Sequence, residues 1–100
     1  MIEAMQYIFQ KGTYEILLEI KKHEKIQPSK LAELIKTISE KTLYKRLEEL
    51  KNLGLIKEEG GINELGRPVK FYSLTPLGKK VIAKFEEVEQ IFQKEGVAIA

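Results

Sequence analysis

Residues 66–81 read GRPVKFYSLTPLGKKV and place three local signals side by side. The Gly-Arg-Pro tripeptide around Arg67 has the composition of a turn. The next residues, VKFYSL, are rich in aromatic and β-branched side chains, which is typical of a strand. Thr75 and Pro76 are residue types preferred at the N-cap and the first position of a helix. The stretch therefore predicts a turn, a strand and a helix start in direct succession.

A partner for this strand lies just upstream in the sequence. Residues 55–59 (LIKEE) predict a second strand, and the GGINELGRP segment between the two strands is rich in turn residues. Two strands joined in this way form an antiparallel hairpin. We therefore expect a wing of about residues 55–74 with a long tip.

The segment before the hairpin, residues 37–54, predicts a helix of about residues 39–53. Its apolar stripe, with the spacing i, i+4 and i+7, consists of Leu43, Leu47 and Leu50. The glycine that ends the segment is a helix stop. Two starts fit the sequence: a capping box of Thr37 with Glu40, or Ser39 as the N-cap itself.

Hydrophobic periodicity predicts the remaining elements of the chain. They are a helix at 2–9, a helix at 12–23, a short extended segment before Pro28, a two-turn helix capped by Ser29, a C-terminal helix at 76–94 and a tail at 95–100. Two helices joined by a tight turn and followed by a β-hairpin make a winged helix-turn-helix. We expect a mostly helical α+β fold, with residues 1–100 as a single winged-helix domain. Its core would span residues 12–75, between N- and C-terminal dimerisation helices.

The composition limits the classes of function. The 100 residues, 43% of them hydrophobic, fit one domain, and no apolar run is long enough to span a membrane. The N-terminus lacks the pattern of a secretory signal, and the chain has no cysteine, so we expect a cytoplasmic protein without disulfides. The net charge of +2 is well below that of a nonspecific coat for nucleic acids.

Catalytic and metal-binding patterns are missing from the sequence. It contains no pairing of a nucleophile with a base and no glycine-rich phosphate loop, so we expect neither an enzyme nor a cofactor. His23 is the single histidine, and no cysteine or aspartate accompanies it, which argues against a zinc site. Its position at a predicted helix C-terminus favours an interaction with the helix dipole instead.

The segment ISEKTLYKRLEELKNLGLIKEE, followed by GRPVKFYSLTPLGKKVI, resembles the PadR-like and HxlR/MarR-like groups of prokaryotic transcriptional regulators. The shared features are a Ser/Thr-led recognition helix, a Gly-Leu-Ile exit and a wing that ends in Tyr-Xaa-Leu-Thr-Xaa-Xaa-Gly. The resemblance covers roughly residues 12–85. It implies a homodimeric DNA-binding repressor or activator, in a class often controlled by a small molecule. No residue set indicates such an effector here, and sensing by a reactive cysteine is excluded.

In a helix-turn-helix the second helix enters the major groove N-terminus first. If the leucine stripe faces inward, Lys41 and Lys45 face outward, and Thr42 and Tyr44 lie on the flanks. Lysine can donate to guanine or phosphate, threonine to either, and tyrosine to phosphate. The alternative is a solvated helix face, with Tyr44 packed on the preceding helix. Arg46 fits a contact to phosphate and a pair with a glutamate equally well.

Other candidate DNA contacts lie outside this helix. Arg67 could reach the minor groove, where narrow A·T-rich sequence attracts arginine, or it could pair with Glu64. Lys70 fits a phosphate contact or a solvated strand face. The wing as a whole is not basic, which argues against tight contact. The complete set of candidate DNA-binding residues is Ser29, Lys30, Ser39, Lys41, Thr42, Tyr44, Lys45, Arg67 and Lys70.

Apolar residues on the two terminal helices predict dimerisation. The C-terminal helix spaces them at intervals of four, three and four, as in a coiled-coil seam. The candidate dimer residues are Ile2, Met5, Ile8, Phe9, Val81, Phe85, Val88 and Phe92. The alternative is that both faces cover the core of their own chain. The expected partners are thus double-stranded DNA and a second copy of the chain. The competing hypotheses are a winged-helix module that binds proteins and a nonspecific architectural DNA-binding protein.

Overall fold

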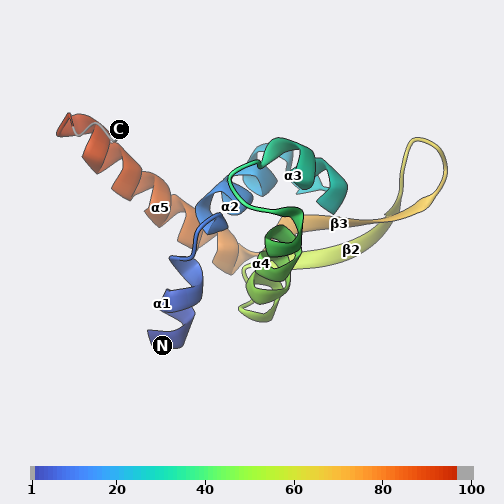
Figure 1. Ribbon diagram of the computed structural model, residues 1–100, viewed down its shortest axis with the longest axis horizontal. Helices are drawn as coiled ribbons and strands as arrows, with labels where there is room; N and C mark the ends of the chain where they lie inside the picture. Colours follow the sequence, from blue (N-terminus) through green and yellow to red (C-terminus); the bar gives the residue numbers. More distant parts are fainter. Residues whose placement is uncertain (1, 97–100) are drawn as a thin grey trace.

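The computed structural model describes residues 2–96, which form five helices and one three-stranded sheet (Figure 1). In chain order the elements are α1 (Ile2–Ile8), α2 (Thr13–His23), β1 (Lys25–Ile26), α3 (Pro28–Leu34), α4 (Glu40–Asn52), β2 (Ile56–Ile62), β3 (Pro68–Leu74) and α5 (Pro76–Lys94). This order is the one predicted from the sequence, and it confirms the winged helix-turn-helix. The predicted tail at 95–100 lies outside the described residues from 97 onward.

The sheet has the strand order β1-β3-β2, and both pairings are antiparallel. β2 and β3 pair along their full length, from Ile56 opposite Leu74 to Ile62 opposite Pro68. The wing strand is longer than the predicted LIKEE segment, because Gly60 and Gly61 belong to the strand and not to the turn. The hairpin consequently projects from the body of the protein, and its tip lies far from the helices (Figure 1).

The core lies between the sheet and the helices α2 to α5. The leucine stripe of α4 is buried, as predicted, together with the inner faces of α2 and the sheet. The buried hydrophobic residues are Ile16, Leu17, Ile20, Ile26, Leu31, Ile35, Leu43, Leu47, Leu50, Leu55, Ile56, Tyr72, Leu74 and Ile82. Helix α4 therefore sits on a rigid base, and its opposite face is directed to solvent.

The predicted cap of α3 is wrong. The helix begins at Pro28 with Gln27 as its N-cap, and Gln27 provides no side-chain cap. Proline fits the first helical position because its φ is already helical and its missing N–H needs no partner there. Ser29 is therefore an exposed residue inside the first turn and does not cap the helix.

The start of α5 explains the Leu-Thr-Xaa-Xaa-Gly end of the wing. The Thr75 hydroxyl donates to the Gly54 carbonyl and accepts a hydrogen bond from the Gly78 N–H at 3.0 Å. A Cβ atom on Gly78 would lie 2.0 Å from the Leu55 carbonyl oxygen, so only glycine allows this approach. These contacts fix α5 to the turn between α4 and β2. Within residues 2–96, no helix combines the length and apolar character needed to cross a membrane.

Candidate nucleic-acid interface

The N-terminus of α4 is closed by Ser39 and not by a Thr37–Glu40 capping box. The Ser39 Oγ accepts a hydrogen bond from the Thr42 N–H at 3.1 Å and donates to the Thr42 Oγ1 at 2.9 Å. The Thr37 hydroxyl donates instead to the Glu15 carboxylate at 2.9 Å, which ties the turn before α4 to α2. The turn and the start of the helix are thereby held in one defined arrangement.

Lys41 and Lys45 lie on the face of α4 opposite the leucine stripe and are exposed. Neither lysine makes an ion pair with another residue between positions 2 and 96. Tyr44 lies on the same half of the helix with 43% of its surface exposed, so it does not pack fully against α3. The first two turns of α4 thus present two cations and a phenol to solvent.

The second half of α4 is neutralised within the chain. The Arg46 Nη1 lies 3.0 Å from the Glu49 Oε1, and the Arg46 Nε donates to the Lys11 carbonyl at 3.1 Å. The Lys51 Nζ lies 3.2 Å from the Glu48 Oε1. Arg46 was expected either to contact phosphate or to pair with a glutamate, and in the structure it pairs with Glu49. The acidic residues that would repel phosphate have local partners.

The turn between α3 and α4 adds a candidate that was missed from the sequence. Lys36 is exposed, lies three residues before the Ser39 cap, and makes no ion pair among the residues that the structure describes. The signal for it was a basic residue just before the helix that was expected to enter the major groove. At the start of α3, Lys30 lies 3.4 Å from the Glu33 carboxylate, so that predicted phosphate contact would compete with an internal pair.

Two of the three cations in the wing have carboxylate partners. The Lys57 Nζ lies 3.0 Å from Glu59, and the Lys70 Nζ lies 3.6 Å from Glu58. Arg67 is exposed at the tip and makes no ion pair with Glu64 or with any other described residue. Of the predicted wing contacts, Arg67 is thus available to a ligand, whereas Lys70 would have to leave Glu58.

Glu58 connects the wing to the core. The Tyr72 hydroxyl donates to the Glu58 Oε2 at 3.0 Å. Burial, together with this hydrogen bond, raises the pKa of Tyr72 to about 12. The same hydrogen bond, aided by Lys51 and Lys70, lowers the pKa of the Glu58 carboxyl. The Glu58 carboxylate also lies 3.7 Å from the Lys51 Nζ of α4. This ion pair connects the base of the wing to α4.

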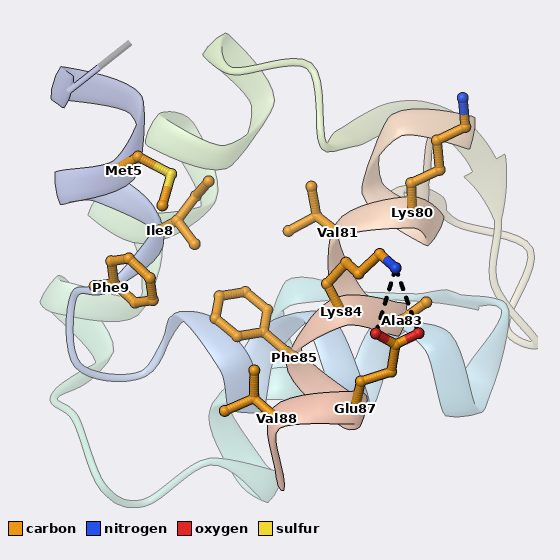
Figure 2. A pocket seen from close by; sticks show the side chains of 10 residues that line it. All are labelled: Met5, Ile8, Phe9, Lys80, Val81, Ala83, Lys84, Phe85, Glu87 and Val88. Atoms are coloured by element: carbon orange, nitrogen blue, oxygen red, sulfur yellow. Dashed lines mark hydrogen bonds and ion pairs between the residues drawn. The ribbon is translucent and has the colours of Figure 1, made fainter. Parts of the chain in front are cut away.

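A second exposed surface, formed by α1 and α5, is apolar. We call it the terminal-helix groove, and Figure 2 shows its side chains. It has a volume of about 560 Å³ and is lined by Met5, Ile8, Phe9, Lys80, Val81, Ala83, Lys84, Phe85, Glu87 and Val88. Phe9 and Phe85 meet edge to face across it, with their ring centroids 6.1 Å apart. Six of the eight predicted dimer residues line this one surface.

Only part of the predicted dimer seam is covered by its own chain. Val81, Phe85 and Ile8 pack partly against the core. Farther along α5, Val88 and Phe92 are each 50% exposed. Ile2, Met5 and Phe9 of α1 are also exposed. The first half of α5 thus packs on the core of its own chain, whereas the second half of α5 and much of α1 are left exposed by the described residues.

Comparison with known proteins identifies relatives of the chain. Residues 10–84 match the model of the PadR-like family of transcriptional regulators. A MarR-family transcriptional regulator from Porphyromonas gingivalis is 34% identical and superposes with a TM-score of 0.74, over 95% of this chain and 89% of that protein.

Two further relatives are similar over shorter stretches. PadR from Bacillus subtilis, solved in complex with operator DNA, is 20% identical and superposes with a TM-score of 0.61. That match covers 72% of this chain and 44% of PadR, and it shows a shared fold. An uncharacterised protein of Methanocaldococcus jannaschii is 42% identical over 52 residues, which is 52% of this chain and 42% of the relative. The chain thus matches less than half of that protein's length.

Proposed function

Because the chain belongs to the PadR-like family of transcriptional regulators, we propose that it is a sequence-specific DNA-binding regulator that acts as a homodimer. In this proposal α4 lies in the major groove with its N-terminus inward, and the wing approaches the adjacent minor groove. The fold that the chain shares with PadR, a protein solved in complex with operator DNA, supports DNA as the ligand.

The exposed first half of α4 is the observation that carries the proposal. Lys41 and Lys45 have no carboxylate partner among residues 2–96, whereas most other charged residues on α4 are paired within the chain. The buried leucine stripe fixes the direction of this cationic face. Lysine side chains in the major groove donate to guanine or to phosphate, and Thr42 between them can donate to either.

The proposed homodimer forms through the terminal-helix groove. To contact successive major grooves on one side of the duplex, a dimer with two-fold symmetry must hold its two copies of α4 about 34 Å apart. Aromatic and aliphatic side chains in this groove provide the apolar contact that a stable interface needs. A second copy would bury Phe92 and Val88, which the single chain leaves half-exposed.

A module that binds another protein is the second candidate, because the wing carries paired charges. Ion pairs on β2 and β3 leave little positive charge there for phosphate. This candidate predicts no affinity for DNA that depends on salt. Contacts to phosphate require such a dependence, because they release counterions.

The test is selection from a random-sequence duplex pool with the purified protein, followed by affinity measurements at two salt concentrations. The expected result is an enriched inverted repeat whose affinity falls as the salt concentration rises. Binding that depends on salt without enrichment would replace the proposal with an architectural role. No binding at either salt concentration would favour the protein-binding module.

A further inference from the structure

The tip of the wing exposes large apolar side chains at the point farthest from the core. It consists of residues 63–67, between β2 and β3 (Figure 1). Leu65 is 77% exposed, and Ile62 at the adjoining end of β2 is 71% exposed. A single exposed leucine is common on protein surfaces, but this one lies beside Arg67, on the element proposed to face DNA. The tip therefore combines one cation with an apolar side chain that is left largely uncovered by residues 2–96.

Hydrogen bonds within the tip hold Leu65 in one position. The Asn63 Oδ1 accepts hydrogen bonds from the backbone N–H groups of Leu65 and Arg67, both at 3.0 Å. The Gly66 N–H donates to the Asn63 carbonyl at 3.0 Å, and Gly66 has a φ of 77°, which suits glycine. Leu65 is thus presented by a loop with a defined conformation, so less conformational entropy is lost when it binds.

The two strands below the tip are braced as well. The Phe71 ring lies so close over Gly61 that a Cβ atom there would be 2.5 Å from the ring. The Lys25 Nζ of β1 lies 4.9 Å from the centroid of the same ring. The ring thereby links the hairpin to β1.

The wing has little unpaired positive charge with which to attract DNA phosphate. Residues 56–74, which comprise both strands and the tip, contain three cations and three glutamates, and two of the cations already have carboxylate partners. Arg67 alone among the described wing cations is without one. Apolar contact by the exposed tip would add affinity for DNA that does not depend on these charges.

We propose that Leu65 is an apolar wedge that enters the minor groove beside Arg67, contacts the sugar walls and partly unstacks one base step. Apolar wedges of this kind bend the duplex toward the major groove, and flexible pyrimidine–purine steps yield most easily. This inference rests on the proposed function. It assigns to Leu65 a share of the affinity and of the sequence preference at positions that the recognition helix does not touch.

The test uses the full-length protein and the duplex enriched by the selection described above. Leu65→Ala is compared with Leu77→Ala, which removes an exposed leucine from the first turn of α5. Leu65→Met keeps an apolar side chain of similar volume. Affinity is measured at two salt concentrations, and DNA bending is measured by energy transfer between dyes at the two ends of the duplex.

Leu65→Ala should lower the affinity about tenfold, by the same factor at both salt concentrations, and should reduce the bend. Leu65→Met and Leu77→Ala should behave like the wild-type protein. Arg67→Ala should instead reduce the dependence of affinity on salt, because it removes a cation. The different salt responses separate the apolar contact from the ionic one.

Three results would overturn the wedge. The first is unchanged affinity and bending for Leu65→Ala on DNA that the wild-type protein binds, which would leave the proposed function intact. The second is a change in the sedimentation of the free Leu65→Ala protein, which would assign the tip to a contact between proteins. The third is the absence of any DNA binding by the wild-type protein, which would remove the proposed function together with the wedge.

Discussion

Helices α4 and α5 are both amphipathic, but their apolar stripes differ in how far they are buried. In α4 the stripe is completely buried, with Leu43, Leu47 and Leu50 each 1% exposed. In α5 only Gly78 and Ile82 are buried, and the apolar residues continue along the exposed second half of the helix. The same helical spacing of apolar residues thus produces a buried face in α4 and a partly exposed face in α5.

The difference follows from where each helix lies. α4 packs across the sheet and against α3, so its whole stripe has a neighbour. α5 crosses α2 with its first half and then extends beyond the body of the protein (Figure 1). A buried stripe leaves the opposite, charged face of α4 for a polar ligand. An uncovered stripe leaves α5 an apolar face, which a protein partner would bury.

The largest difference in stability is expected when one apolar residue of each stripe is replaced by alanine. Leu47→Ala should lower the free energy of unfolding by about 3 kcal/mol, because it creates a cavity in the core. Phe92→Ala should change the stability of the isolated chain by less than about 1 kcal/mol, since the ring is half-exposed. Urea denaturation of both variants at two protein concentrations measures these changes.

The protein concentration is the control in this experiment. A dimer held by α5 unfolds at a urea concentration that rises with protein concentration, and Phe92→Ala should weaken that dependence. Leu47→Ala should keep it. Equal losses of stability in the two variants at both concentrations would mean that the second half of α5 belongs to the core.

A smaller effect is expected at the first turn of α5, the part of this helix that the core does use. Gly78→Ala should cost about 2 kcal/mol, because the added Cβ meets the Leu55 backbone and the helix must move away. Gly60→Ala is the matched control, since a Cβ on Gly60 has nothing within 4 Å. Thermal denaturation should separate the two variants, and equal midpoints would contradict the tight contact at Gly78.

Elements with strong local signals were predictable from the sequence. The start of α5 is marked by two adjacent residues, Thr75 and Pro76, and the buried face of α4 by regularly spaced leucines. Both features were predicted correctly. The extent of β2 was not, because two glycines usually indicate a turn. They remain in the strand because the pairing with β3 continues and Phe71 packs over Gly61.

Partners far apart in the sequence were the least predictable. Nothing in the order of residues shows that Thr37 bonds Glu15 or that Arg46 reaches the Lys11 carbonyl. Which lysines lack an internal partner depends on such contacts. The sequence therefore predicted α4 and the basic residues on it, whereas the structure separates Lys41 and Lys45 from cations that are already paired.

The smallest expected effect concerns the charged face of α4. Lys45→Ala should lower the affinity for the enriched duplex about tenfold and relax the base preference at one position, because it removes a donor from the proposed major-groove contact. The matched control is Lys51→Ala on the same helix. Lys51 lies 3.2 Å from Glu48 and 3.7 Å from Glu58, so it is already neutralised.

Competition binding with single-base variants of the duplex gives both quantities for each protein. Lys51→Ala should bind like the wild-type protein, and neither lysine variant should alter the dimer, whereas Phe92→Ala should weaken the dimer and leave the base preference unchanged. If Lys45→Ala and Lys41→Ala both bound like the wild-type protein, the proposed major-groove contact of α4 would be wrong. The proposed difference between an α4 that faces DNA and an α5 that faces a second protein would then no longer hold for α4.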